Sequence, residues 1–358
     1  MNKFSTKHLF FFIIGSCIIS ITSYSSVFIR LGKNNTWIYA LISCLILICF
    51  ISYYFYIIKV TQISDIKLLF LTYLPNWLTN LSLFIFSIGL LLISIESSTI
   101  QANSIHTNYF IDTPPWFCLL FMLPFAGYFL FKNVTSIVIS LIITITFLIL
   151  GNIFLLFLST KYLDFNYLLP ILRSINIKDS LYCILCLLGS LSSIFIIMPF
   201  LKYLDNTNKL IKNSILGISI SILLICFSLI TTITTFGTIR AGNIFYPEYI
   251  YSQNVVLFNF LEFGSIFFIF KTVSLWFIKY ILSFYSFYLI YKNKINNKIL
   301  FVCIYSIVVF ICSYLLCQNQ YFLFNTLLYL QPILIICFLF IPFIPFTLCL
   351  IKSKKRKR

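Results

Sequence analysis

The sequence predicts an all-α membrane protein with ten transmembrane helices, and its composition and apolar patterning support this fold class. Of the 358 residues, 61% are hydrophobic and 9% are charged, and the mean hydropathy is +1.04. A soluble protein could not bury so large an apolar fraction, so most of the surface must face lipid. The apolar residues also form runs about 20 residues long, the length that a helix needs to cross a bilayer.

Charged residues, prolines and asparagine clusters separate these runs from one another. We place the ten helices at about 9–28, 37–58, 78–103, 115–131, 134–158, 180–201, 214–237, 264–291, 299–317 and 326–351. The connecting segments are too short for a soluble domain. The chain is therefore expected to form one integral membrane domain, 1–358, that ends in a basic tail at 352–358.

The positive charges indicate which side of the membrane each connection faces. If the ten spans alternate, 17 of the 25 Lys and Arg residues lie in the segments on the side of the termini and six lie on the other side. Cytoplasmic segments carry such an excess, so both termini are expected in the cytoplasm. The tail "KSKKRKR" then lies beside anionic lipid, and the net charge of +17 does not require a nucleic-acid partner.

The first apolar run, "FFIIGSCIISITSYSS", contains Gly15, Ser16 and Cys17. Three interpretations are open: a notch for helix packing, a lipoprotein processing site, or a break that holds a ligand. A second Gly-Ser pair, Gly189 and Ser190, opens the second half of the chain 174 residues later. Interrupted helices at matching positions indicate inverted repeats with a binding site between them, here about 9–158 and 180–351. We favour the ligand-holding break, in helices 1 and 6.

Three ionisable side chains fall within the apolar runs, where they are costly and often functional. Glu96 lies in "LLISIESSTIQANS" of the third run, either facing a ligand or proton path or reaching the outer interface. Lys271 and Lys279 are eight residues apart in the eighth run, about 80° apart around the helix. Either lysine could form a charge pair with Glu96.

Motifs of enzymes and metal sites are missing from the sequence. We find no Gly-rich phosphate loop, His-Glu metal helix or nucleophile triad. Cys183 and Cys186 form a CxxC, but they lie in an apolar helix without charged neighbours, and the chain has only two histidines. We expect no enzymatic activity, no cofactor and no metal.

Several blocks, in order along the chain, resemble the B subunits of bacterial spore germinant receptors, the endospore germination permease family. They are "FSTKHLFFFIIGSCIIS", "NNTWIYALISCLI", "IDTPPWFCLLFMLPFAGYFLFKNV", "DFNYLLPIL" and "SLWFIKYILSFYSF". Each motif is loose, and their common order carries the resemblance, which covers nearly the whole chain.

The resemblance implies the fold of amino acid–polyamine–organocation transporters and a role in sensing nutrient germinants, often amino acids, in the spore inner membrane. It implies two partners, a receptor A subunit and a lipoprotein C subunit. The alternative function is an amino-acid transporter, in which Glu96 would couple transport to protons. By analogy with the family, the ligand would lie between helices 1, 3, 6 and 8. The implied ligand-binding residues are Gly15, Ser16, Cys17, Leu92, Glu96, Gly189, Ser190, Ser192, Ser193 and Ser283.

Overall fold

The computed structural model describes residues 4–159, 163–171, 176–255 and 263–357, which form helices and connections without a β-strand. The helices that form the spans are α1 (Leu9–Ser23), α2 (Ser25–Gly32), α3 (Thr36–Thr61), α5 (Asn76–Asn108), α6 (Pro115–Leu130), α7 (Val134–Ser159), α8 (Ile177–Ser192), α9 (Leu210–Asn243), α11 (Phe263–Tyr291), α12 (Lys298–Cys317), α13 (Gln320–Ile335) and α14 (Ile341–Lys357). Two short helices, α4 (Ile66–Tyr73) and α10 (Pro247–Gln253), lie in connections. The prediction of an all-α, multi-spanning membrane protein is confirmed.

Every predicted apolar run contains a helix. Eight helices of the described chain are long and apolar enough to cross a membrane, and two shorter apolar helices, α1 and α6, accompany them. In the numbering of the predicted spans, α1 and α2 together form the first span. The sixth consists of α8 and the 3₁₀ helix η4 (Ser193–Tyr203), and the tenth of α13, the π-helical turn η6 (Ile336–Phe340) and α14.

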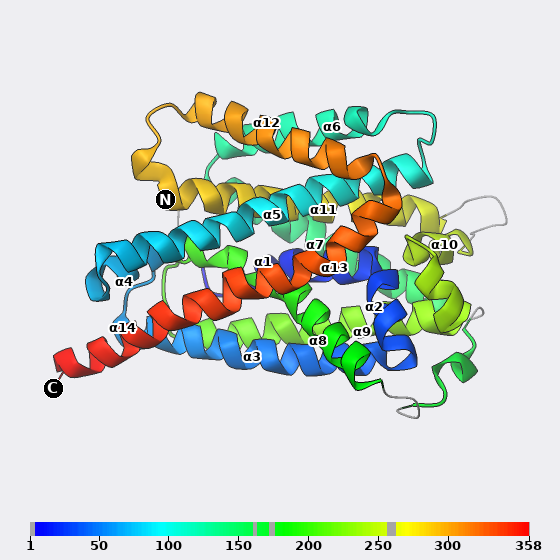
Figure 1. Ribbon diagram of the computed structural model, residues 1–358, viewed down its shortest axis with the longest axis horizontal. Coiled ribbons are helices and arrows are strands. Elements are labelled where there is room, and N and C mark those ends of the chain that lie inside the picture. The colour runs from blue at the N-terminus through cyan, green and yellow to red at the C-terminus, as the bar shows by residue number, and fades with distance from the viewer. Residues whose placement is uncertain (1–3, 160–162, 172–175, 256–262, 358) are drawn as a thin grey trace.

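The packing of the helices recurs with an offset of five spans (Figure 1). Helix α1 packs on α9 as α8 packs on α3, and α7 packs on α1 as α13 packs on α8. Likewise, α6 contacts α11 and α12 contacts α5. Inverted repeats of five helices produce such matched pairs. The residue boundaries of the two repeats remain a prediction.

The first and sixth spans are both interrupted, but the first is not interrupted at its Gly-Ser pair. Helix α1 is continuous through Gly15 and Ser16, and the break comes at Tyr24, whose φ and ψ are −117° and 47°. The expected position of this break was therefore wrong. A glycine lowers the stability of a helix by about 1 kcal/mol. A break at this position would cost more, because it would leave backbone groups without hydrogen bonds away from water. In the sixth span, the α-helical geometry gives way to η4 at Ser193, just after the Gly-Ser pair.

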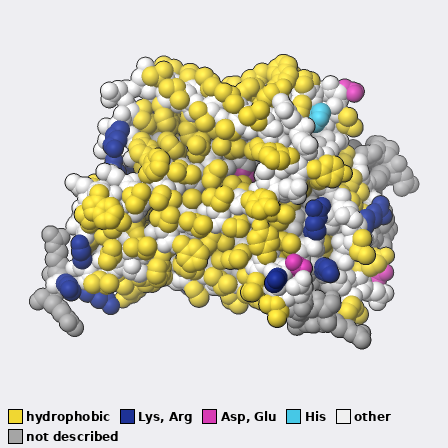
Figure 2. Space-filling model, viewed as in Figure 1, with side chains coloured by type: hydrophobic (Ala, Val, Ile, Leu, Met, Phe, Trp, Pro, Cys, Tyr) yellow, Lys and Arg dark blue, Asp and Glu magenta, His cyan; other side chains and the backbone are white. Residues whose placement is uncertain are grey.

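The surface matches a protein that lies in lipid. In Figure 2 hydrophobic side chains cover the middle of the visible face, and Lys and Arg side chains gather toward its two ends. Large apolar side chains point outward from α6, α7 and α12, among them Phe121, Phe147 and Ile304. Both chain termini lie at the same end of the bundle (Figure 1), as an even number of spans requires.

A buried ion pair as the candidate ligand site

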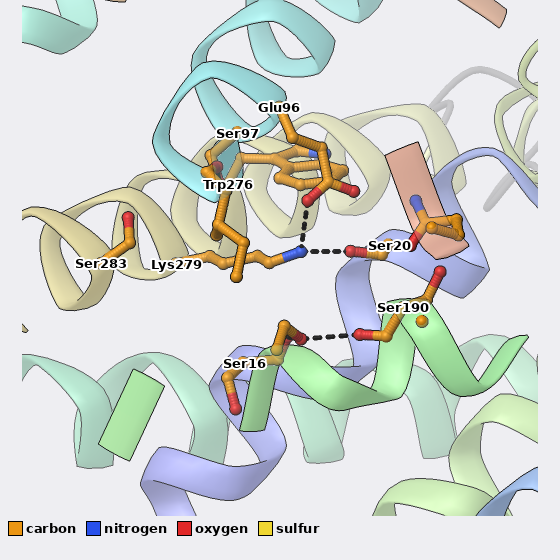
Figure 3. Close-up of polar contacts among 12 residues, drawn as sticks. Ser16, Ser20, Glu96, Ser97, Ser190, Trp276, Lys279 and Ser283 are labelled. Carbon is orange, nitrogen blue, oxygen red and sulfur yellow. Dashed lines mark hydrogen bonds and ion pairs between the residues drawn. The ribbon is translucent and has the colours of Figure 1, made fainter. Parts of the chain in front are cut away.

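The centre of the bundle contains an ion pair between Glu96 of α5 and Lys279 of α11 (Figure 3). The Nζ atom of Lys279 lies 2.8 Å from Oε2 of Glu96, and both side chains are completely buried. Helices α5 and α11 pack against each other along much of their length, which holds the two charges together. The sequence left two positions open for Glu96, the protein interior and the membrane interface. The structure shows that Glu96 lies in the protein interior.

Three further side chains surround the pair. The hydroxyl of Tyr24 donates a hydrogen bond of 2.5 Å to Oε1 of Glu96, and the ammonium group of Lys279 donates to Oγ of Ser20. The indole ring of Trp276 lies 5.1 Å from the Lys279 Nζ atom and gives it a cation–π contact. We call Ser20, Tyr24, Glu96, Trp276 and Lys279 the ion-pair cluster. Charged groups in such an interior are tolerated only when they are paired and hydrogen-bonded in this way.

The break in the first span lies at this cluster, because Tyr24 is both the residue at the break and the partner of Glu96. The hydroxyls of Thr22 and Ser25, on either side of Tyr24, are buried and have no hydrogen-bond partner within the described residues. The side chain of Gln331 donates a bond of 3.2 Å to the Tyr24 hydroxyl, while its own carbonyl oxygen is also buried and unpaired there. Buried polar atoms without partners are rare in proteins, so this concentration marks a place where a polar ligand could supply the missing bonds.

The Gly-Ser segments of the first and sixth spans contact each other directly. The Ser193 hydroxyl donates hydrogen bonds of 2.7 Å to the backbone carbonyl of Ser16, on α1, and to that of Ser190, on α8. The thiol of Cys17 lies 3.7 Å from the carbonyl of Leu191, to which it donates. Ser16, Cys17, Ser190 and Ser193 therefore contribute to the contact between these two spans beside the ion-pair cluster.

The two predicted glycines lie where neighbouring helices approach closely. A Cβ atom on Gly189 would lie 2.3 Å from the backbone oxygen of Gln331, a distance that excludes any side chain. A Cβ atom on Gly15 would lie 3.1 Å from Leu141 and 3.3 Å from Ile278. Both glycines thus serve helix packing in this structure. Their contact with a ligand remains a prediction.

The other predicted residues lie around the same core. Ser283, one helical turn from Lys279, lies 2.7 Å from the hydroxyl of Ser94. The Ser192 hydroxyl donates to the Gly189 carbonyl within its own helix, at 2.6 Å. Leu92 is half-buried and packs against the hydrophobic core.

Lys271 belongs to a second, separate ion pair. Its ammonium group contacts Oε1 of Glu248 on α10, and the two side chains are 3% and 14% exposed. The pairing of Lys271 with Glu96, which the sequence left open, is therefore not formed. The eight-residue separation places the two lysines roughly 12 Å apart along α11. The two lysines therefore pair with different carboxylates.

Several residues of the site were not anticipated from the sequence. They are Ser20, Tyr24, Trp276, Gln331 and, in the second pair, Glu248. Tyr24 and Trp276 do stand out as polar-tipped aromatic residues within apolar runs, a pattern that often marks buried hydrogen bonding. Nothing in the sequence near Gln331 shows that this residue reaches the first span.

The arrangement places one positive and one negative group in a closed, water-poor interior, with spare hydrogen-bonding atoms beside them. This concentration of paired charges and unpaired polar atoms distinguishes the cluster from the apolar core around it. Comparison with curated proteins finds no match. Residues 3–323 match the family model described as spore germination protein, which is most of the chain. The chain therefore belongs to the spore germination protein family, whose members are permease-like membrane proteins.

Proposed function

We propose that this protein is the nutrient-sensing membrane subunit of a spore germination receptor and that it binds a zwitterionic nutrient, an amino acid, at the ion-pair cluster. The observation that carries the proposal is the completely buried pair of Glu96 and Lys279 at the meeting point of α1, α5 and α11. Ionisable groups in membrane spans are commonly kept for function.

The chemistry of the pair favours a ligand with both charges. An amine alone would pair with Glu96 and leave Lys279 as an unpaired buried charge, and a carboxylic acid alone would leave Glu96 unpaired. Either outcome is strongly unfavourable in a low-dielectric interior. An amino acid can place its ammonium group on Glu96 and its carboxylate on Lys279, so that all four charges remain paired.

The interrupted first span offers further groups to such a ligand. Helix α1 ends at Ser23 and α2 begins at Ser25, so the last carbonyls of α1 and the first N–H groups of α2 lie next to the cluster. Carbonyls at a helix C-terminus favour an ammonium group, and N–H groups at a helix N-terminus favour a carboxylate. The unpaired hydroxyls of Thr22 and Ser25 lie at the same break.

Ligand binding at this position would change the contacts between helices. In the structure the pair links α5 to α11, and Ser20 and Tyr24 link both helices to the first span. A ligand that separates Glu96 from Lys279 would favour a different packing of the three helices, which is all that a signal requires. We propose that a receptor A subunit and a lipoprotein C subunit read this change, in the spore inner membrane.

Germination assays on spores that lack this gene test the proposal. We expect these spores to lose their response to at least one amino acid, measured as loss of optical density, while vegetative cells take up the same amino acid at the normal rate. Strong uptake of amino acids by the purified protein alone in vesicles, with an unchanged spore response, would contradict sensing and favour the transporter.

A further inference from the structure

A groove on the membrane-facing side of the bundle lies between α5, α6 and α11 and has a volume of about 680 Å³. It is separate from the ion-pair cluster, whose residues do not line it. The walls come from stripes of side chains one turn apart: Phe117, Phe121 and Phe125 on α6, and Val273 and Phe277 on α11. Phe121 and Phe125 are each 60% exposed, so the groove opens toward the lipid rather than into the protein.

A side chain in the wall of this apolar groove carries a polar atom that has no hydrogen-bond partner within the described residues. Gln101 of α5 lines the groove and is 6% exposed, and its side-chain carbonyl oxygen makes no hydrogen bond within the described residues. A buried carbonyl oxygen without a hydrogen bond is unfavourable, and a donor from a bound molecule would remove that cost. The groove is therefore complementary to a ligand that is apolar over most of its length and donates one hydrogen bond.

The shape and charge of the groove narrow the choice of occupant. Along α6 its lining extends from Phe117 to Phe129, a rise of roughly 18 Å parallel to the helices. Gln101 lies seven residues before the end of α5, so the polar atom is near one membrane interface and the apolar part extends inward. None of the described residues that line the groove carries a charge, which disfavours phosphate or ammonium head groups. A transmembrane helix of this length would fill roughly 1,400 Å³, about twice the volume of the groove.

We propose that this groove binds a single-chain amphiphile with an uncharged hydroxyl head, whose O–H donates to the side-chain oxygen of Gln101 and whose chain lies along the Phe-rich stripe of α6. The site takes its ligand from the bilayer and does not depend on the nutrient site.

Photolabelling of the purified full-length protein in phosphatidylglycerol vesicles tests the proposal. The probe is a hexadecanol analogue with a diazirine on its chain, and the labelled residues are mapped by mass spectrometry. We expect labelling to concentrate on α6 and the facing side of α11. Unlabelled hexadecanol should displace the probe at about fivefold lower concentration than hexadecyl methyl ether, which has no donor.

Two variants test whether Gln101 accepts the hydrogen bond from the alcohol. Gln101→Leu should abolish the difference between the alcohol and the ether, whereas Gln318→Leu, at an exposed glutamine outside the groove, should preserve it. The comparison on the unmodified protein stands even if Gln101→Leu fails to fold. Equal displacement by alcohol and ether, or labelling of α7 and α12 as strong as that of α6, would overturn the proposal. Protection of the groove in the assembled receptor would also overturn it and would assign the groove to a partner helix.

Discussion

The cost of burying Glu96 is offset only while Lys279 is present, and the reverse holds equally. Both side chains are completely buried, and the carboxylate also accepts a hydrogen bond from Tyr24. Removing one member of such a pair leaves an uncompensated charge, whereas replacing both by neutral groups is often tolerated.

This asymmetry predicts the stability of three variants. Glu96→Gln and Lys279→Met should each lower the free energy of unfolding by about 3 kcal/mol, and the double variant should recover most of that loss. Thermal unfolding of the purified proteins in detergent measures the effect. If the double variant lost as much free energy of unfolding as the two single variants together, the two groups would not be compensating each other.

At the scale of residues, the sequence identified Glu96 and two candidate lysine partners but not the residues that hydrogen-bond to the pair. Glu96 and Lys279 stand out because ionisable residues are rare in apolar runs. The choice between Lys271 and Lys279 could not be made, because both lie on similar faces of one helix. Tyr24 and Gln331 are 72 and 235 residues away from Glu96 in the chain, and only the packing of three spans brings them together.

At the scale of helices, the hydroxyl of Ser193 contributes one of the hydrogen bonds that link the first and sixth spans. Ser193 lies at the start of η4 and bonds the carbonyl of Ser16 on α1. The neighbouring Ser192 hydroxyl instead bonds a carbonyl of its own helix, that of Gly189. The two serines are equally buried, so they form a matched pair for comparison.

Ser193→Ala should therefore lower the free energy of unfolding by about 1 kcal/mol, because it removes a bond between spans, and should shift the nutrient dose-response of spores. Ser192→Ala should leave the dose-response unchanged. The measurements are thermal unfolding and germination at graded amino-acid concentrations. Identical dose-responses for the two variants would show that the contact between the spans has no role in sensing.

The Gly-Ser segments lie where these two spans contact each other, but the first span does not break at its Gly-Ser pair. Local sequence shows that Gly15 permits close packing, yet α1 continues through it for eight more residues. The break at Tyr24 coincides with the hydrogen bond from this tyrosine to Glu96, a contact between different spans. Helix propensity cannot locate a break that coincides with a tertiary contact of this kind.

For the whole molecule, the number of spans follows from hydropathy alone, since each apolar run became a helix. The sequence does not predict the short helix α4, because eight residues in a connection give no clear periodic signal. The packing of the helices repeats with an offset of five spans, and the two Gly-Ser pairs, in the first and sixth spans, are separated by the same offset. The sequence does not predict which helices lie side by side, and the structure shows this.

The distribution of Lys and Arg predicts that both termini face the cytoplasm. Fluorescent protein fused to either terminus should therefore be fluorescent, while alkaline phosphatase at the same positions should be inactive. Phosphatase inserted between α5 and α6, at residues 110–113, should be active, because this connection lies at the opposite end of the bundle (Figure 1). The reverse pattern of activities would place the basic segments outside.

The ligand preference of the purified protein in vesicles tests the central claim most directly. Equilibrium binding is measured for alanine, alaninamide and propionate, on the unmodified protein and on Glu96→Gln, Lys279→Met and Lys271→Met. We predict that the unmodified protein and Lys271→Met, which alters the second ion pair, prefer alanine at least tenfold. Lys279→Met should shift the preference toward alaninamide and Glu96→Gln toward propionate. An unchanged preference for alanine in both variants would contradict a ligand site at the buried ion pair.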